Sequence, residues 1–311
     1  MKKKIFIDGR AGTTGLRIYE RLENREDIEL IVLSEEERKD VAARKKALNE
    51  ADIAFLCLPD DAARESVAMI DNDKTVVIDT STAHRTLDGW TYGFPELSGK
   101  IADALKDSRR IAVPGCHASG FIALVYPLIE KGILPPAVHL TCHSITGYSG
   151  GGKKMIGEYE SEERSPLLDA PRQYALTQTH KHLKEMKAIT GLQSEPIFCP
   201  IVSDFYSGMT VTVPIFKGQL NEGFSAEDIK AAYAEKYHGE IVEYASDAAD
   251  GGFISGAKLQ GLDSMKITVT GNDERILLIA MYDNLGKGAS GAAVECLNYV
   301  LGADKTEGLD V

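Results

Sequence analysis

The chain has 311 residues, of which 43% are hydrophobic and 26% charged; this balance is typical of globular proteins and excludes a disordered chain, a collagen-like fibre and a disulfide scaffold. Its 47 acidic residues outnumber its 35 basic ones, giving a net charge of -12. Because no element concentrates positive charge, nucleic-acid binding is not expected. The longest apolar runs, such as residues 276–281, are too short for the roughly 20 residues that span a bilayer, so no membrane partner is expected.

The basic residues Lys2, Lys3 and Lys4 precede a short apolar run that stops at Asp8-Gly9. A signal peptide would continue with a longer apolar stretch, so we expect a cytoplasmic protein.

The five cysteines are widely spaced at positions 57, 116, 142, 199 and 296, without a C-x-x-C pair. This spacing predicts free thiols and no metal site.

The first hundred or so residues predict alternating strands and helices. The candidate strands are short, β-branched and nearly free of alternation, which is typical of strands buried on both faces of a parallel sheet. They lie at residues 4–7, 29–33, 52–58, 75–79 and 110–113, with helices at 14–22 and 61–69 between them. An α/β domain with a Rossmann-type parallel sheet is therefore expected.

Beyond about residue 137 the strand candidates alternate polar with apolar residues, as one-sided antiparallel strands do. They lie at residues 138–144, 209–216, 264–270 and 275–282, and the last two are joined by a short polar turn that predicts a hairpin. Helices are expected at 226–237, with Ser225 as N-cap, and at 291–301, ending at Gly302. This half therefore predicts an α+β domain with a mainly antiparallel sheet.

A glycine-rich turn follows the first strand and opens a helix. It reads Gly9, Arg10, Ala11, Gly12, Thr13, Thr14, Gly15. This spacing is a variant of the dinucleotide-binding fingerprint, in which glycine lets the backbone approach a pyrophosphate and the helix N-terminus receives its charge. The turn predicts a nicotinamide-dinucleotide site; the alternative is a structural turn that binds nothing.

The residues after the second strand leave the choice between NAD and NADP open. Ser34, with Arg10 or Arg38 nearby, would suit the 2′-phosphate of NADP, whereas Glu35 would favour the free 2′-hydroxyl of NAD. A run of glutamates is also common in a solvated loop.

Cys116 is the best candidate nucleophile. It stands in Pro114-Gly115-Cys116-His117, between a strand and an apolar stretch of helical length at residues 121–129. This places its thiol at a helix N-terminus, whose positive end stabilises a thiolate. Cys57 lies within an apolar run, which is typical of a cysteine that packs in the hydrophobic core.

Seven histidines are candidates for the acid/base that a thiolate mechanism needs: 84, 117, 139, 143, 180, 182 and 238. The pair His180 and His182 stands out because it precedes a predicted helix ending near Gly191. Their rings would share a face only if the backbone is extended there. His117 is a poor partner for Cys116, since adjacent helical side chains point about 100° apart.

A thiol and a nicotinamide cofactor together suggest interconversion of an aldehyde and a thioester, followed by acyl transfer to water, coenzyme A or phosphate. Arg85, which follows a sheet strand, could bind a phosphate or carboxylate. The alternative for Arg85 is an ordinary arginine on a surface loop, without a ligand.

Six motifs occur in order along nearly the whole chain: Gly9 to Gly15, Tyr92 to Leu97, Pro114-Gly115-Cys116, Ser144 to Gly152, His180-Lys181-His182 and Lys287 to Gly291. In this arrangement the chain closely resembles the short form of the N-acetyl-gamma-glutamyl-phosphate reductase family. The resemblance implies NADPH-dependent reduction of N-acetyl-L-glutamyl 5-phosphate to N-acetyl-L-glutamate 5-semialdehyde with release of phosphate, a step of arginine biosynthesis.

The resemblance also implies residue roles. Cys116 would carry the acyl group, and the acid/base would be His180 or His182, with His180 preferred. Asn284, Lys287 and Gly288 would approach the nicotinamide, and Ser144 and Gly147 would lie in a substrate-side loop. Longer family members usually have Asp-Phe before the arginine where this chain has Ala83-His84, so the phosphate role of Arg85 is a hypothesis.

The family's fold implies an NADP-binding Rossmann domain at residues 1–113, completed by the C-terminal helix within 286–311, and a catalytic and oligomerisation domain at 114–285. A homo-oligomer, dimer or tetramer, is expected. The alternatives are a reductase of the same fold acting on aspartyl phosphate or N-acetyl-aminoadipyl phosphate, a non-catalytic NADP-sensing regulator, or a cysteine hydrolase. A sensor would not need Cys116 or the histidine pair, and a hydrolase would not need the glycine turn.

Overall fold

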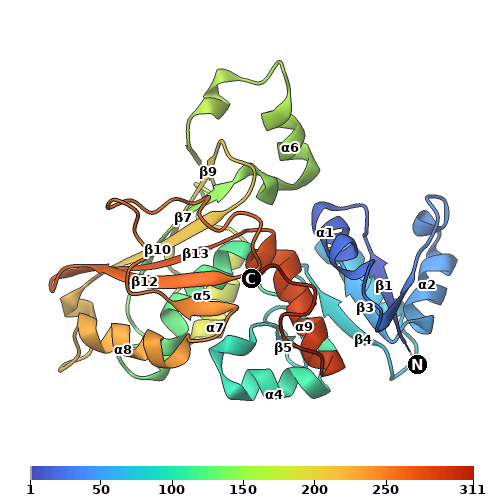
Figure 1. The fold of residues 1–311 in the computed structure, drawn as a ribbon, viewed down its shortest axis with the longest axis horizontal. Coiled ribbons are helices and arrows are strands. Elements are labelled where there is room, and N and C mark those ends of the chain that lie inside the picture. The colour runs from blue at the N-terminus through green and yellow to red at the C-terminus, as the bar shows by residue number, and fades with distance from the viewer. Residues whose placement is uncertain (1) are drawn as a thin grey trace. The chain divides into compact units, whose positions relative to one another are not determined.

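The computed structural model describes residues 2–311, and its backbone contacts divide them into two compact units. The first unit contains residues 2–115 and Ala289–Leu309. The second contains Cys116–Gly288 and Asp310–Val311. Each unit is built on its own β-sheet (Figure 1).

The first unit has a six-stranded sheet in the order β2-β1-β3-β4-β6-β5, and every neighbouring pair is parallel. Its strands are β1 (Lys3–Asp8), β2 (Ile28–Ile31), β3 (Ile53–Leu56), β4 (Val76–Asp79), β5 (Thr91–Tyr92) and β6 (Arg110–Ala112). The central strand β3 is buried along its whole length, as expected for a parallel sheet covered on both faces. The predicted Rossmann-type sheet is confirmed.

Helices cover both faces of this sheet. Successive strand residues point to opposite faces, so Ile5 and Ile7 of β1 pack in one core and Phe6 packs in the other. The first core also holds side chains of α1 (Thr13–Leu22), α4 (Gly99–Asp107) and α9 (Gly291–Leu301). The second holds side chains of α2 (Val41–Glu50) and α3 (Asp60–Met69). The strand order reverses between β1 and β3, and ligands of such sheets bind where the order reverses.

The second unit has a seven-stranded sheet in the order β11-β12-β13-β10-β7-β9-β8. Its strands are β7 (Thr141–Gly147), β8 (Arg172–Gln173), β9 (Ile197–Ser203), β10 (Met209–Phe216), β11 (Val242–Tyr244), β12 (Met265–Gly271) and β13 (Arg275–Tyr282). Four of the six neighbouring pairs are antiparallel, while β7 with β9 and β11 with β12 are parallel. The expected mainly antiparallel sheet and its β12–β13 hairpin are confirmed.

The helices of the second unit are α5 (Cys116–Glu130), α6 (Gly152–Glu160), α7 (His182–Thr190) and α8 (Ala226–Lys236). Hydrogen bonds fix α8 against α5, because the hydroxyls of Tyr233 and Tyr237 donate to the carbonyls of Leu124 and Ala123. Helix α5 packs closely on the sheet at Gly120, where an ideal Cβ would lie 2.8 Å from Val211 and from Tyr282. Helix α6 belongs to a long excursion of the chain between β7 and β8 (Figure 1).

Several expected elements have different bounds in the structure. Strand β7 begins at Thr141 and not at Val138, because Val138 N–H closes a turn onto the carbonyl of Pro135. The second strand ends at Ile31, two residues earlier than predicted. Helices α2, α4 and α6 and strands β5, β8, β9 and β11 were not predicted.

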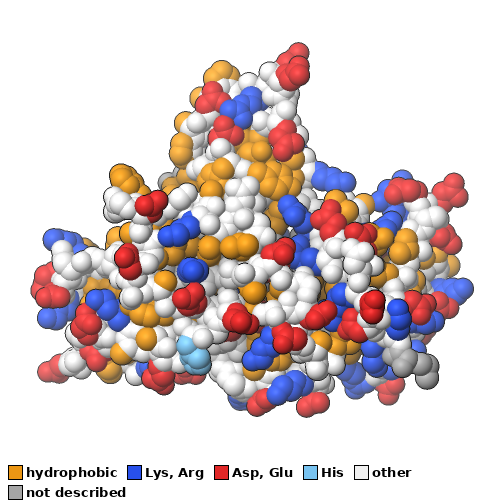
Figure 2. All heavy atoms as spheres, in the orientation of Figure 1, with side chains coloured by type: hydrophobic (Ala, Val, Ile, Leu, Met, Phe, Trp, Pro, Cys, Tyr) orange, Lys and Arg blue, Asp and Glu red, His pale blue; other side chains and the backbone are white. Residues whose placement is uncertain are grey.

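Between residues 2 and 311, no helix is both long and apolar enough to cross a membrane. Figure 2 shows acidic and basic side chains interspersed over the face that is drawn.

Candidate active site

The glycine-rich turn follows β1 directly, and two of its glycines are required by the protein's own packing. Gly9 has a φ of +88°, and a Cβ there would lie 2.3 Å from the carbonyl oxygen of Cys57. A Cβ on Gly15 would lie 2.5 Å from the carbonyl oxygen of Gly9. These positions allow the tight passage from β1 into α1 that the sequence predicts.

Gly12 differs from the other two glycines. Its φ is -75°, and the nearest atom to a Cβ there lies at 3.4 Å, so the fold itself tolerates a side chain. It is the N-cap of α1 and makes no side-chain cap bond, and the first helical turn holds no acidic residue. The first N–H groups of the helix are therefore left for another acceptor. Thr13 and Thr14 open this turn. The geometry fits a dinucleotide whose pyrophosphate approaches the backbone at Gly12.

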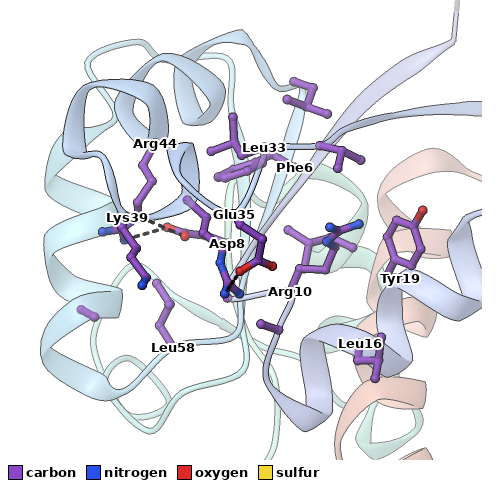
Figure 3. Close-up of a pocket in the computed structure, with 17 residues that line it drawn as sticks. Phe6, Asp8, Arg10, Leu16, Tyr19, Leu33, Glu35, Lys39, Arg44 and Leu58 are labelled. Carbon is purple, nitrogen blue, oxygen red and sulfur yellow. Dashed lines mark hydrogen bonds and ion pairs between the residues drawn. The ribbon is translucent and has the colours of Figure 1, made fainter.

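A pocket of about 650 Å³ lies beside this turn (Figure 3). Its walls come from β1, the turn, α1, β2 and the segment after β2, with single residues from α2, from α3 and from the segment after β3. The lining residues are Phe6, Ile7, Asp8, Gly9, Arg10, Ala11, Leu16, Tyr19, Ile31, Val32, Leu33, Glu35, Arg38, Lys39, Arg44, Leu58 and Ala62. Four cationic and two acidic side chains among them give the pocket a positive balance, which suits a phosphorylated ligand.

The cations of this pocket differ in their partners. Arg44 Nη2 lies 2.9 Å from Asp8 Oδ2 (Figure 3). The Ser66 hydroxyl donates to the same carboxylate. Arg38 pairs with Glu35. The Arg10 guanidinium lies 4.7 Å from the centre of the Tyr19 ring, while Lys39 has no ion-pair partner within residues 2–311.

Ser34 does not line the pocket. Its N–H donates to the carboxylate of Glu37 at 2.9 Å, and its hydroxyl accepts the Glu37 N–H at 3.2 Å. These bonds from Ser34 lower the pKa of Glu37. The structure thus gives Ser34 a turn-forming role, while Arg10 and Arg38 line the pocket. The role of these three residues at a 2′-phosphate stays a prediction.

Cys116 is the first residue of the 15-residue helix α5 and is half-buried. The Tyr282 hydroxyl donates to the Cys116 carbonyl at 2.5 Å and accepts the N–H of Gly120 at 3.0 Å. On another side, a Cβ on Gly288 would lie 3.1 Å from the Cys116 Cβ. The start of α5 is therefore held tightly, with the thiol at the positive end of the helix, where a thiolate is stabilised.

The other cysteines lie in different environments. Burial raises the pKa of Cys57 to about 12 and also raises the pKa of the Cys142 thiol. Cys296 is fully buried in the core of the first unit. Thiols in such sites react slowly. Cys199 is half-buried but lies within strand β9 and not at a helix start, so Cys116 is the best-placed nucleophile by position.

His117, the next residue along α5, is buried between two hydroxyl groups. Its Nδ1 lies 2.6 Å from Ser144 Oγ and its Nε2 lies 2.6 Å from the Tyr174 hydroxyl oxygen. Burial and the neighbouring His180 lower the pKa of His117 to about 3. The ring is therefore neutral at physiological pH, and both of its nitrogens are engaged, so it is poorly suited to exchange a proton with Cys116.

His180 and His182 lie beside His117. Their ring centres are 4.7 Å apart, and they lie 5.9 and 5.7 Å from that of His117. The expectation that the two rings meet only across an extended backbone was wrong. Lys181 is in the helical region, and the His182 N–H donates to His180 Nδ1 at 3.2 Å, so His180 folds back over the start of α7.

The segment around Asn284 is held by polar contacts. The Asn284 amide donates to the Ser149 hydroxyl and accepts the Gly208 N–H. Asp283 accepts the Ser207 hydroxyl at 2.6 Å and the Gly261 N–H at 2.7 Å. A π-helical turn at Gly286–Ser290, which includes Lys287 and Gly288, follows, and such turns are frequent at functional sites.

The expectation that Ser144 and Gly147 lie in a loop was wrong, because both belong to strand β7. The Ser144 side chain faces His117, and a Cβ on Gly147 would lie 2.6 Å from the Tyr206 carbonyl oxygen. Close packing against the backbone therefore requires glycine at position 147.

Arg85, in the first unit, is buried, and its Nε and Nη2 donate to the carbonyls of Val113 and Thr80. These bonds give Arg85 a structural role, and its role in phosphate binding stays a prediction.

Two residues of this site were not found by sequence reasoning. Tyr174 bonds His117 across 57 positions, and Tyr282 bonds Cys116 across 166 positions. Burial raises the pKa of both tyrosines, and a negative charge on Cys116 raises them further. They act as neutral hydroxyls. Neither belongs to a local motif, and only the position of Tyr174 shortly before the histidine pair could have drawn attention to it.

Comparison with known proteins gives a consistent assignment. Residues 4–105 match the semialdehyde dehydrogenase NAD binding domain, and residues 116–284 match the semialdehyde dehydrogenase dimerisation domain. The N-acetyl-gamma-glutamyl-phosphate reductase 2 of Nostoc sp. is 45% identical, covering 99% of each chain. A protein of Chelativorans sp. named N-acetyl-gamma-glutamyl-phosphate reductase is 47% identical, covering 97% of this chain and 99% of its own.

Solved structures show the same fold. The aspartate semialdehyde dehydrogenase II of Vibrio cholerae has a TM-score of 0.74 at 17% identity, covering 97% of this chain and 98% of its own. That of Candida albicans, solved with NADP, has a TM-score of 0.69 at 16% identity, covering 97% of this chain and 99% of its own. The chain therefore belongs to the semialdehyde dehydrogenase family and, within it, to the N-acetyl-gamma-glutamyl-phosphate reductases.

Proposed function

We propose that the chain reduces N-acetyl-L-glutamyl 5-phosphate to N-acetyl-L-glutamate 5-semialdehyde with NADPH and releases phosphate, as a cytoplasmic enzyme of arginine biosynthesis. The observation that carries this proposal is Cys116 at the first position of α5, held by Tyr282 and bordered by Gly288. Full-length relatives that are 45–47% identical carry the name of this activity.

The chemistry requires a nucleophile and a proton donor. Cys116 Sγ attacks the acyl carbon and forms a thioester, and the bond from that carbon to the phosphate oxygen breaks so that phosphate leaves. Bound NADPH supplies the hydride that reduces the acyl carbon. A histidine protonates the oxygen of the resulting thiohemiacetal. The reverse proton transfer lets the thiohemiacetal collapse to the aldehyde and return Cys116 to its thiolate form.

We assign the acid/base role to His180. It is half-buried, whereas His182 is 5% exposed and sits in the first turn of α7. The bond from the His182 N–H occupies Nδ1 of His180, which makes Nε2 the nitrogen that exchanges the proton. In this assignment His182 packs under His180 and supplies the backbone bond that orients it. Ser144 and Gly147, both on β7, would lie on the substrate side of the site.

NADP(H) fits the first unit. The turn from Gly9 to Gly15 and the first N–H groups of α1 would hold the pyrophosphate. Arg10, Arg38 and Lys39 supply cations for a 2′-phosphate in the adjoining pocket. Glu35, the residue that would favour NAD, is engaged by Arg38. The nicotinamide end would be received by Asn284, Lys287 and Gly288.

A homo-oligomer, dimer or tetramer, fits the second unit. Alternate residues of its strands form an outer sheet face, which includes Ile145, Ile197 and Leu277, exposed by 39%, 60% and 38%. Helix α5 packs on the opposite face at Val211. An apolar sheet face of this kind is typical of an interface between copies, and this unit matches a dimerisation domain model.

The test is a steady-state assay in the direction of NADPH formation. The purified protein is given N-acetyl-L-glutamate 5-semialdehyde, phosphate and NADP, and absorbance of NADPH is followed. One arm omits phosphate, one replaces NADP with NAD, one uses aspartate semialdehyde, and Cys116→Ser is the blank. We expect phosphate-dependent reduction of NADP that is lost in Cys116→Ser. Turnover only with aspartate semialdehyde would overturn the substrate assignment, and tight NADP binding without any turnover would favour a sensor.

A further inference from the structure

The segment between β8 and α7 has an unusual backbone. Among residues 2–311, the non-glycine residues with positive φ are Ala175, at 52°, and Gln178, at 55°, and both lie in this segment. Left-handed backbone at residues with a Cβ is disfavoured and persists only where surrounding contacts impose it. The segment leads from Tyr174 to His180, so it carries the bond to His117 at one end and the proposed acid/base at the other.

The Gln178 side chain supplies the contacts that impose this conformation. Its Oε1 accepts the Phe198 N–H at 2.8 Å, and its Nε2 donates to the Phe198 carbonyl at 2.7 Å. Strand β8 pairs with β9 only at Ile201 and Val202, and the Tyr174 N–H then bonds the Pro200 carbonyl. The Gln178 amide thus continues the ladder along β9 at a point where no backbone strand is present.

The same Phe198 also contacts the histidines. Its ring centre lies 5.2 Å from that of His180 and 5.2 Å from that of His117. The residue whose backbone anchors Gln178 therefore also forms part of the surface on which the two imidazoles rest. A shift of the segment along β9 would move His180 relative to His117.

We infer that Gln178 is a positioning residue for the reaction: its amide clamps the histidine segment to the backbone of Phe198 and so sets where His180 lies. The inference rests on the proposed role of His180. Gln178 itself touches neither Cys116 nor the histidine rings through a hydrogen bond. It acts through the backbone that it holds.

Two substitutions separate positioning from folding. Gln178→Gly removes the clamp and also the disfavoured φ, so we expect Tm to stay near the wild-type value while kcat falls at least tenfold. Gln178→Met keeps the volume and loses both bonds, so we expect the same loss of kcat with a lower Tm. The KM for NADPH should be unchanged in both. Gln173→Met, an exposed glutamine on β8, is the matched control and should keep wild-type kcat.

Gln178→Glu adds a pH signature. Its ionised carboxylate cannot donate to the Phe198 carbonyl, whereas the protonated acid can donate one bond and accept the other. Position 178 is exposed, and an exposed glutamate has a pKa of about 4.3, so we expect the ratio of wild-type to variant kcat to shrink as pH falls from 6 to 4.5. The ratio for Gln178→Met should stay constant over that range.

A readout independent of turnover keeps this inference distinct from the proposed function. In NMR spectra of the imidazole groups, Gln178→Gly should shift the signals of His117 and His180 and leave those of the exposed His139 and His238 in place. Unshifted rings together with wild-type kcat in Gln178→Gly and Gln178→Met would overturn the inference. If the wild-type protein does not turn over the semialdehyde, the proposed function fails, and the ring signals still decide whether Gln178 positions His180.

Discussion

The Tyr282 hydroxyl donates a 2.5 Å hydrogen bond to the backbone carbonyl of Cys116. The same oxygen accepts the N–H of Gly120, one helical turn further along α5. A residue at the end of β13 therefore fixes the backbone that carries the proposed nucleophile.

Tyr282→Phe should destabilise the protein and slow the reaction. It leaves the Cys116 carbonyl and the Gly120 N–H without this partner, which should cost about 1–3 kcal/mol of unfolding free energy. Thermal unfolding and the rate of Cys116 alkylation by iodoacetamide measure the two effects. Tyr233→Phe removes a bond to the Leu124 carbonyl on the same helix and should lower Tm without changing the alkylation rate. Equal alkylation rates in wild-type and Tyr282→Phe would show that this hydroxyl does not position the thiol.

Gly120→Ala should damage the same site by overpacking. A Cβ there would lie 2.8 Å from the Tyr282 hydroxyl and from Val211 Cβ, and such crowding costs about 1–3 kcal/mol. We expect a lower Tm and a kcat reduced at least tenfold. Gly157→Ala is the control, because this glycine lies exposed in α6 with nothing within 4 Å of its Cβ position. It should raise stability by about 0.5–1 kcal/mol. Full activity in Gly120→Ala would contradict the close packing of α5 on Tyr282.

Because His117 is buried and neutral, the free energy of unfolding should fall as the pH is lowered. Burial holds its pKa at about 3 in the folded protein against 6.5 in the unfolded chain. Below pH 6.5 the unfolded chain binds a proton that the folded protein does not bind until near pH 3, so unfolding is favoured progressively as pH falls through this window. The loss should reach roughly 2 kcal/mol at pH 5.

Tm measured at pH 7 and pH 5 tests this contribution. His117→Gln should lose less stability on acidification than the wild type, because glutamine does not titrate. His139→Gln, at an exposed histidine, should keep the wild-type difference. An unchanged pH dependence in His117→Gln would mean that this ring is not held neutral by burial.

The cofactor preference should depend on the cations of the first unit's pocket. Arg10→Ala or Lys39→Ala should raise the KM for NADPH about tenfold. This is the loss expected when one charge-assisted hydrogen bond to a phosphate is removed. The KM for NADH should hardly change, because NADH lacks the 2′-phosphate. Glu35→Gln releases Arg38 from its ion pair and should lower the KM for NADPH. Parallel rises for both cofactors would place these cations away from the 2′-phosphate.

Elements with local signals could be predicted from the sequence. Strands β10 and β13 and helix α9 have the predicted bounds, and α8 begins after Ser225 as predicted, in a capping box with Asp228. Cys116 starts α5 because the Pro-Gly pair and the apolar run that follows mark the boundary. In each case the signal lies within a few residues of the element.

Features that depend on distant partners could not be predicted. Strand β9 contains Pro200, which argues against a central strand from sequence alone, yet it lies between β7 and β8. The arrangement of His180 and His182 depends on the turn at Lys181 and on Phe198. The clamp made by Gln178 joins positions 20 residues apart, and no periodic pattern points to it.

The central claim is that Cys116 carries the acyl group, and a phosphate-free burst experiment tests it most directly. The protein is mixed with N-acetyl-L-glutamate 5-semialdehyde and NADP in the absence of phosphate, and NADPH formation and intact protein mass are recorded. Without phosphate to accept the acyl group, we predict a burst of one NADPH per chain and an N-acetylglutamyl adduct on Cys116, with phosphate restoring turnover. A burst that persists in Cys116→Ser, or an adduct on another residue, would contradict the account.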